Sequence, residues 1–356
     1  MILPATYLSG LLLMILALAC AGSWTSTFKA ARPFRYELYY LDFSVGALLC
    51  AVLAAFTLGS LRSNELTFAD NFLITGYRPM VFAVAAGMIF NLGNVILLAG
   101  ISAGGIALCV PLAFGAALAI DATWDFIADP RTNALLLFGG VAVVLGAVVL
   151  LALANLRHRR AVDEAAKKAL QPDPRSKEAK AKPKRVAAGV PVILAIVGGV
   201  ILAFSPHVLA AAREGDNGVA PYGLTLLFAI GIMFSTIVYS PFVITFPIGG
   251  SPAVIADYFK GGLRGHILGV LGGIVLCAGA LAGNIVLGST AARLLGPTWI
   301  LGLTQAAPLV AMLWGVIVWR EFRGAVLSVS SFLWGAFLLY AVGVALVAFA
   351  PLYGSH

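Results

Sequence analysis

Residues 156–187 read LRHRRAVDEAAKKALQPDPRSKEAKAKPKRVA, and this one polar stretch decides how the rest of the chain is arranged. It carries eleven of the 23 Lys and Arg residues and separates five apolar segments before it from five after it. Loops rich in Lys and Arg stay on the cytoplasmic side of a membrane. The stretch therefore predicts the cytoplasmic face. Because five spans lie on each side of it, both chain termini are expected on the opposite side.

The composition excludes a water-soluble fold. Hydrophobic residues make up 61% of the chain and charged residues 11%, and the mean hydropathy is +0.99. A globule of this composition would expose large apolar patches to water. We therefore expect a multi-pass protein of the cell (inner or plasma) membrane. Its formal charge of +8 is typical of cytoplasmic loops that face anionic lipid, so lipid contacts are expected and a nucleic-acid partner is not.

The apolar segments have the length of transmembrane helices, since about 20 residues cross about 30 Å of hydrocarbon. The fold class predicted is an all-α polytopic membrane protein with ten transmembrane helices. The first segment lacks a basic flank and a clear cleavage site and is interpreted as a span rather than a signal peptide. With the basic stretch inside, 18 Lys and Arg lie inside and five outside. The expected spans are 4–24, 40–60, 79–101, 103–123, 134–155, 188–206, 221–246, 265–288, 298–319 and 325–350.

The basic stretch also divides the chain into two halves of similar size. We expect a first five-helix repeat, a basic cytoplasmic linker and a second five-helix repeat, at residues 1–155, 156–187 and 188–356. Within the linker, residues 159–170 could form a short helix, and residues 171–185, with three prolines and mixed Lys and Glu, are expected to be a solvated linker. An odd number of spans per half gives the halves opposite orientations, which is typical of inverted-repeat transporters.

Two dipeptides recur in matching spans of the halves and support the repeat. Gly93-Asn94 in the third span corresponds to Gly283-Asn284 in the eighth, and Pro111-Leu112 in the fourth corresponds to Pro308-Leu309 in the ninth. Prolines within spans free backbone carbonyls, which a transporter uses to line a cavity.

Polar and aromatic side chains within the spans are the candidates for a binding site. Burying an amide or hydroxyl without a partner costs about 2–7 kcal/mol, so each must pair with protein, water or ligand. Each could form an interhelical hydrogen bond instead. Together, however, amides and aromatic planes suit a flat, neutral, hydrogen-bonding solute. The candidate substrate-binding residues are Trp24, Asn91, Asn94, Tyr239, Asn284, Gln305 and Trp314.

Charged residues are scarce within the spans. Asp42 begins the second span, Glu321 follows the ninth and Asp121 ends the fourth. Carboxylates inside a membrane mark ion or proton pathways, so Asp42 is the candidate for proton coupling. All three lie near a membrane interface, where a solvated or salt-bridged carboxylate is the alternative.

The sequence carries one pattern that an enzyme could use. Asp121, Asp125 and Asp129 share a helix face at i, i+4 and i+8 and could hold Mg²⁺ against a diphosphate, as intramembrane prenyl transferases do. No second acidic cluster, Ser/His arrangement, zinc-ligand spacing or P-loop accompanies them. The four cysteines all fall in apolar spans and are expected to pack. We therefore predict no catalytic residue, no metal site and no cofactor.

Short motifs resemble one family in order and spacing. They are Gly22-Ser23-Trp24, Tyr40-Leu41-Asp42-Phe43-Ser44, Asn91-Leu92-Gly93-Asn94, Phe204-Ser205-Pro206, Gly283-Asn284, and Gln305 to Val310 followed by Trp314-Gly315 and Glu321. The chain resembles the ureide permease family, as a bacterial relative, within the drug/metabolite transporter superfamily. The plant members have a longer central loop with a Walker-like motif, which this chain lacks.

The resemblance implies a permease of ten helices that works by alternating access. It implies proton symport of neutral heterocycles such as allantoin, uracil, hypoxanthine or xanthine, with protons and a small solute as partners. The cavity would lie between the halves, with the third, fourth, eighth and ninth spans among its walls. Two alternatives stay open: a sugar porter of the same superfamily, and a membrane scaffold or receptor that transports nothing and signals through the basic stretch.

Overall fold

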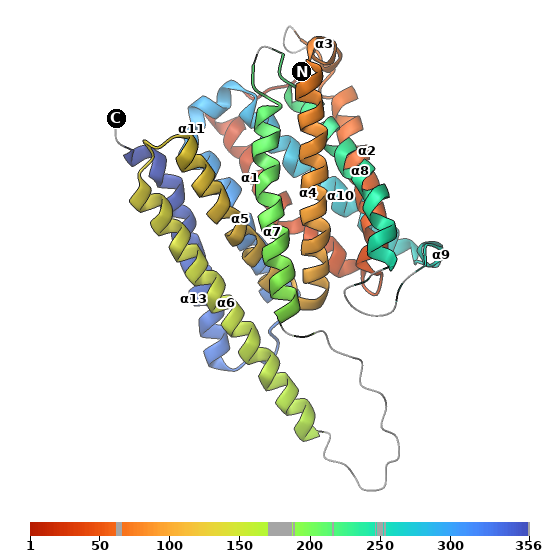
Figure 1. The fold of residues 1–356 in the computed structure, drawn as a ribbon, viewed down its shortest axis with the longest axis vertical. Coiled ribbons are helices and arrows are strands. Elements are labelled where there is room, and N and C mark those ends of the chain that lie inside the picture. Colours follow the sequence, from red (N-terminus) through yellow and green to blue (C-terminus); the bar gives the residue numbers. More distant parts are fainter. Residues whose placement is uncertain are drawn as a thin grey trace.

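The described part of the protein consists of helices and the loops that connect them (Figure 1). A computed structural model describes residues 1–61, 66–169, 187, 189–215, 217–245, 247, 252 and 254–354. Within those ranges there is no β-strand. The all-α class predicted from the sequence is therefore confirmed.

Ten helices in the described part are long and apolar enough to cross a membrane, which confirms the predicted number. Nine spans are single helices, and the ninth span comprises α11, α12 and a π-helical turn, η1. Short helices α3 (Phe68–Ile74) and α9 (Ala256–Phe259) and the 3₁₀ turn η2 (Ala350–Tyr353) lie in the connections or at the C-terminal end. The spans are α1 (Tyr7–Ala31), α2 (Tyr36–Phe56), α4 (Tyr77–Gly104), α5 (Ile106–Ala128), α6 (Ala134–Ala169), α7 (Gly189–Ala211), α8 (Pro221–Thr245), α10 (Leu263–Leu287), α11 (Thr290–Gln305) with α12 (Ala307–Leu313) and η1 (Trp314–Val318), and α13 (Leu327–Phe349).

The first span is longer than hydropathy indicates. A capping box between Thr6 and Ser9 begins α1, and the helix continues to Ala31, past the expected end at residue 24. The polar residues after Trp24 lower the hydropathy but keep the helical hydrogen bonds. The helix ends just before Pro33, because a residue that precedes proline is disfavoured in the helical region.

Helix α6 also differs from expectation. It runs through 36 residues, about 54 Å, which exceeds the hydrocarbon thickness of a bilayer. The helix expected at residues 159–170 is thus the continuation of the fifth span rather than a separate element. The linker expected at residues 171–185 lies outside the described residues.

The helix ends lie at two faces of the bundle. The face that carries both chain termini, at the top of Figure 1, is here called the terminal face. The opposite face, where α6 projects below the other helices, is called the basic face (Figure 1). Helices α1, α4, α6 and α8 run toward the basic face, and α2, α5, α7, α10 and α13 start there.

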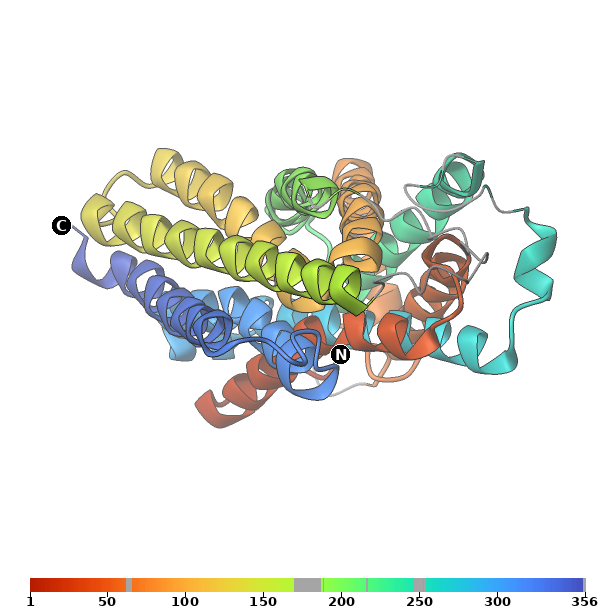
Figure 2. The same ribbon diagram turned by 90° about the horizontal axis from the view of Figure 1, so that it is seen from below.

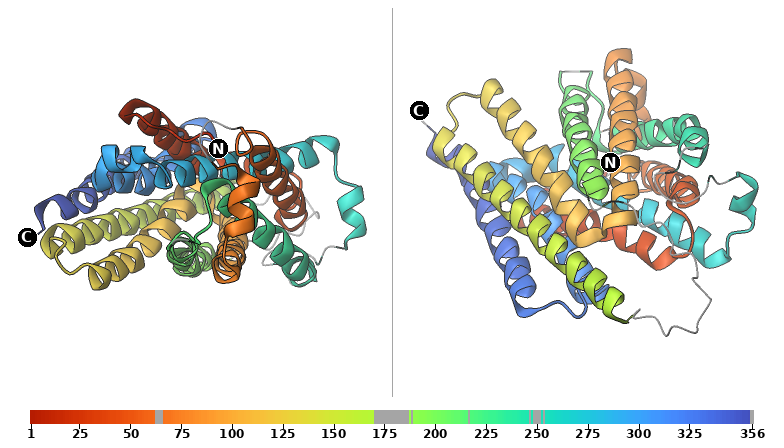
Figure 3. Two further views of the ribbon diagram at one scale, coloured as in Figure 1. Left: turned by 90° about the horizontal axis from the view of Figure 1, so that it is seen from above. Right: turned by 60° about the horizontal axis from the view of Figure 1, so that its bottom comes forward.

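Eight spans form a closed ring. Each packs on the next in the order α1, α10, α2, α8, α4, α7, α5 and α12, and α12 packs on α1 again. The remaining two spans, α6 and α13, pack on each other along one edge of this ring, as Figures 2 and 3 show. Helix α9 lies at the opposite edge (Figure 2).

Close approach of α4 and α8 depends on glycine. A Cβ atom on Gly87 would lie 2.1 Å from the Phe228 carbonyl oxygen, and one on Gly231 would lie 2.2 Å from that of Val84. Small residues let helix backbones approach in a membrane. The contact places Asn91, one turn beyond Gly87, directly against α8.

The ninth span is interrupted at several positions. Gly296 has a φ of 74° and precedes Pro297, so α11 is kinked there. The π-helical turn begins at Trp314, and Arg320, just after it, has a φ of 48°. Non-glycine residues rarely adopt positive φ, and π-helical turns are frequent at functional sites. Such discontinuous helices are typical of spans that line a transport pathway.

Candidate functional site

Two asparagines on α4 contact the neighbouring spans. Asn91 and Asn94 are three residues apart, share one helix face and are almost fully buried. The Asn91 amide nitrogen donates to Ser235 Oγ at 2.7 Å and to Thr236 Oγ1 at 3.1 Å, both on α8. The Asn94 amide nitrogen donates to the Tyr40 hydroxyl on α2 at 2.9 Å. The two amides thus tie three helices together.

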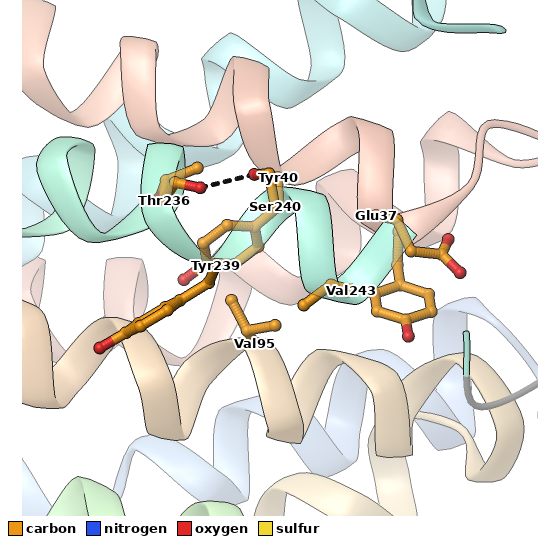
Figure 4. A pocket seen from close by; sticks show the side chains of 8 residues that line it. Glu37, Tyr40, Val95, Thr236, Tyr239, Ser240 and Val243 are labelled. Carbon is orange, nitrogen blue, oxygen red and sulfur yellow. Dashed lines mark hydrogen bonds between the residues drawn. The ribbon is translucent and has the colours of Figure 1, made fainter. Parts of the chain in front are cut away.

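A pocket lies directly beside these amides, between α2, α4 and α8 (Figure 4). Its cavity volume is about 10 Å³, which leaves room for about one water molecule. In Figure 4, Val95 of α4 points toward Tyr239 of α8. Tyr40 and Thr236 both line the pocket. Asn94 is hydrogen-bonded to the Tyr40 hydroxyl and Asn91 to the Thr236 hydroxyl, so each asparagine contacts one lining hydroxyl. The lining residues are Tyr36, Glu37, Tyr40, Val95, Thr236, Tyr239, Ser240 and Val243.

The lining of the pocket mixes polar and aromatic groups. It combines phenol and aliphatic hydroxyls with aromatic rings and two valines. Its carboxylate, Glu37, is buried and paired with Arg35 Nη2 at 2.9 Å. The cavity volume of about 10 Å³ is far below the 300–1,000 Å³ of ligand pockets, so this conformation is closed to a ring-sized solute.

Aromatic rings continue from this pocket toward α1. Tyr40 and Phe43 have ring centroids 4.9 Å apart, and Phe43 lies 5.2 Å from Trp24. Trp24 is only 4% exposed, so it forms part of the packed interior behind the pocket in this conformation. On α1 the neighbouring Ser23 accepts a hydrogen bond from Trp314 Nε1 at 2.8 Å.

The other two candidates lie nearer the terminal face. Asn284 of α10 donates to Thr225 Oγ1 of α8 at 3.0 Å. Thr225 is eleven residues before Thr236 on the same helix, which corresponds to about 16 Å. Gln305 of α11 lies beside the Asp121 carboxylate. The structure thus brings Asn91, Asn94 and Tyr239 together around one pocket and links Trp24 to it. It leaves Asn284, Gln305 and Trp314 outside the pocket.

Asp42, the candidate for proton coupling, is buried at the start of α2 with two partners that the sequence did not indicate. His266 Nδ1 of α10 lies 2.8 Å from its Oδ2, and the Tyr258 hydroxyl of α9 donates to its Oδ1. Burial, together with the hydrogen bond to Asp42, raises the pKa of Tyr258 to about 12, so this phenol stays a donor. Asp42 is therefore held by an imidazole nitrogen and by a phenol that remains a hydrogen-bond donor.

Glu321 also has partners from distant parts of the chain. Its carboxylate pairs with Lys29 Nζ and accepts the backbone N–H groups of Ile106 and Ala107, each at 2.9 Å. A carboxylate at a helix N-terminus is stabilised by the helix dipole. The contact joins the ends of α1 and the ninth span to the start of α5 at the basic face.

The acidic residues Asp121, Asp125 and Asp129 have different surroundings in the structure. Asp121 pairs with His207, Asp125 is exposed one turn further along α5, and Asp129 pairs with Arg131 beyond the helix. Among the described residues, no group of three or more His, Cys, Asp or Glu is placed to hold a metal ion.

Comparison with known proteins identifies relatives of this chain. The family described as Ureide permease matches residues 39–204, a range that includes Tyr40, Asp42, Asn91 and Asn94. Ureide permease 2 of Arabidopsis thaliana is 24% identical over 370 residues, covering 87% of this chain and 89% of that protein. Ureide permease 3 of the same plant is 31% identical over 138 residues, covering 38% of this chain and 40% of its own length.

A third relative, probable ureide permease A3 of Vigna unguiculata, is 28% identical over 143 residues. The match spans 38% of that protein and 38% of this chain. These matches confirm the resemblance to the ureide permease family. The matching proteins are from plants rather than from bacteria. Proteins named permeases are transporters and not enzymes, in agreement with the sequence analysis.

Proposed function

We propose that this relative of the ureide permeases is a secondary active transporter of a small neutral solute, namely a ureide or a purine or pyrimidine base. The observation that carries the proposal is the closed pocket between α2, α4 and α8, with hydroxyls on its walls and the Asn91 and Asn94 amides bonded to two of them. In the transport cycle this pocket would open to admit the solute. Such solutes present flat faces and amide edges. The Tyr239 ring would offer a stacking surface, and the hydroxyls of Tyr40 and Tyr239 would offer donors and acceptors.

We further propose that the two halves are inverted repeats that alternate access. Reciprocal helix pairs support this: α4 packs on α7 as α10 packs on α1, and α2 packs on α10 as α8 packs on α4. In each half the third span supplies an asparagine that donates to a hydroxyl of a second span, Asn94 to Tyr40 and Asn284 to Thr225. These bonds lie toward opposite faces, as a two-fold axis in the membrane plane requires. The corresponding division of the chain is 1–155, 156–187 and 188–356.

Proton coupling is proposed to use Asp42. A coupling carboxylate must exchange a proton with a neighbour, and the His266 imidazole nitrogen lies within 2.8 Å of Asp42 Oδ2. Both lie near the basic face, which the excess of Lys and Arg assigns to the cytoplasm. Protons entering with the solute would be released on that side. The protein would then reside in the plasma membrane, with both termini outside.

The remaining candidates, Trp24, Asn284, Gln305 and Trp314, are proposed to face the solute in another state of the cycle. Trp314 begins the π-helical turn, and Gln305 lies just before the break between α11 and α12. Both therefore lie at points where the ninth span can bend. A bend there would turn these side chains relative to α1 and α5.

Uptake into proteoliposomes with an imposed proton gradient tests the proposal. Radiolabelled allantoin, uracil, xanthine and glucose form the substrate panel, and protein-free liposomes and a protonophore are the controls. Gradient-dependent accumulation of a ureide or nucleobase is expected. Accumulation of glucose alone would identify a sugar porter. No accumulation of any solute, with no thermal stabilisation by any of them, would refute transport; a solute at 100 times its Kd adds about 2.7 kcal/mol.

A further inference from the structure

An acid and an imidazole meet at the terminal face, away from the pocket. Asp121 Oδ1 on α5 lies 3.1 Å from His207 Nε2 on α7, and both side chains are largely buried, at 16% and 17% exposure. The two residues belong to different halves of the chain. Their contact therefore joins the halves directly, 86 residues apart in sequence.

The imidazole is also covered by an aromatic ring. The Trp124 indole, one turn after Asp121, stacks on the His207 ring with centroids 4.8 Å apart and an interplanar angle of 27°. Trp124 is itself half exposed, so water reaches the edge of this stack. A cationic ring on an indole face is stabilised by the cation–π interaction.

The charged groups that interact directly with the imidazole are two carboxylates, Asp121 and Asp125, both on α5. Gln305 of α11, which is neutral, lies beside Asp121. Helix α4 packs against α7, and its cation in this region, Arg78, is exposed in the first turn. Arg213 and Glu214 follow the end of α7.

A matching contact exists at the basic face. There Glu321, after the ninth span, pairs with Lys29, near the end of α1. In both places an acid near the end of the fourth span of one half meets a base near the end of the first span of the other half. The two differ in one respect: lysine is permanently charged, whereas histidine gains its charge by binding a proton.

We infer that Asp121 and His207 form a proton-binding site at the terminal face, and that proton uptake converts the pair into an ion pair between the two halves. Nε2 faces Asp121, and Nδ1 has no hydrogen-bond partner among the described residues, so Nδ1 accepts the incoming proton. The pair then changes from a net charge of −1 to neutral. The imidazolium is held by the carboxylate on one side and by the indole face on another.

The Asp121–His207 contact would therefore hold α5 and α7 together more strongly at low pH than at high pH. The statement that this pH is that of the external medium rests on the proposed function, which assigns the terminal face to the outside. A protonated pair holds α5 against α7 as Lys29 and Glu321 hold the opposite end. Loss of the proton leaves a weaker hydrogen bond between a neutral ring and a carboxylate.

Trp124 fluorescence tests the site without any transport assay. A protonated imidazole stacked on an indole quenches its emission, so the purified full-length protein is titrated in detergent between about pH 5 and 8. The difference between the wild-type protein and Trp124→Phe isolates Trp124 from the other five tryptophans. Emission from Trp124 is expected to fall with one midpoint as the pH decreases.

Substitutions identify the residue whose protonation changes the Trp124 emission. His207→Gln is expected to abolish the titration, whereas His158→Gln, a histidine on α6 near the basic face, should retain it. Asp121→Asn should move the midpoint to lower pH by about one unit, since a nearby carboxylate stabilises the imidazolium. Emission that does not vary with pH, or a titration that persists in His207→Gln, overturns the site. A midpoint unchanged in Asp121→Asn overturns the ion pair. A protein that transports no solute can still give this titration, so the two proposals fail separately.

Discussion

Asn94 and Tyr40 form a buried hydrogen bond of 2.9 Å between α4 and α2, and this bond fixes the wall of the pocket. Tyr40 is 3% exposed and Asn94 1%, so neither has water as an alternative partner. Removing the phenol oxygen leaves a buried amide without its acceptor. That loss costs about 1–3 kcal/mol.

Tyr40→Phe also removes a hydroxyl from the pocket wall. The loss of one hydrogen bond to the solute is expected to raise KM for solute uptake about tenfold, the change that corresponds to about 1.4 kcal/mol. Initial uptake rates over a range of solute concentrations measure it. Tyr77→Phe is the matched control, because Tyr77 is 81% exposed at the start of α4. Equal KM values for Tyr40→Phe and the wild-type protein would show that the Tyr40 hydroxyl does not contact the solute.

Asn284→Ala is expected to reduce uptake at normal membrane expression. Its amide donates to Thr225, so the comparison variant is Thr225→Val, which removes the hydroxyl but keeps the amide. If Asn284 also meets the solute, Asn284→Ala lowers uptake more than Thr225→Val does. Equal losses in the two variants would mean that Asn284 only ties α10 to α8.

The spans could be predicted from hydropathy, whereas the partners of their polar residues could not. Ten apolar stretches and the shared face of Asn91 and Asn94 are local properties of the sequence. The contact of His266 with Asp42 joins residues 224 positions apart, and that of Lys29 with Glu321 joins residues 292 apart. No periodicity encodes such distances. They follow from helix packing, which is set by close contacts such as that at Gly87.

Helix boundaries were missed for a related reason. Hydropathy measures transfer into lipid, and it ends α1 near Trp24 although the backbone stays helical to Ala31. Hydropathy likewise predicts the ninth span as one continuous helix. The kink at Gly296 and the π-helical turn at Trp314 depend on local backbone geometry rather than on hydrophobicity.

Asp42→Asn is expected to abolish accumulation driven by a proton gradient while solute exchange across the membrane continues. An amide cannot take part in proton transfer with His266, but it preserves the size of the side chain and can still accept from Tyr258. Asp257→Asn is the matched control, since Asp257 pairs with Lys260 at the surface. Gradient-driven accumulation that persists in Asp42→Asn would place the coupling elsewhere.

Gly231→Ala is expected to destabilise the protein by about 1–3 kcal/mol through overpacking. The added methyl would lie 2.2 Å from the backbone oxygen of Val84, which cannot move without shifting α4. Gly335→Ala on α13 is the control, because nothing lies within 4 Å of its added methyl. Thermal unfolding in detergent measures both variants. A midpoint for Gly231→Ala equal to that of the control would contradict the close α4–α8 contact.

Glu321→Gln is expected to lower stability strongly, because it leaves the partly buried Lys29 ammonium without its counter-charge. Breaking a buried ion pair from one side costs about 3–5 kcal/mol, whereas removing both charges often costs little. Lys29→Met combined with Glu321→Gln should therefore recover much of the loss. Thermal unfolding in detergent provides the measurement for both single variants and the double variant. If the unfolding temperature of the double variant equals the sum of the two single effects, the two side chains act independently. The helix ends at the basic face would then be held together by other contacts.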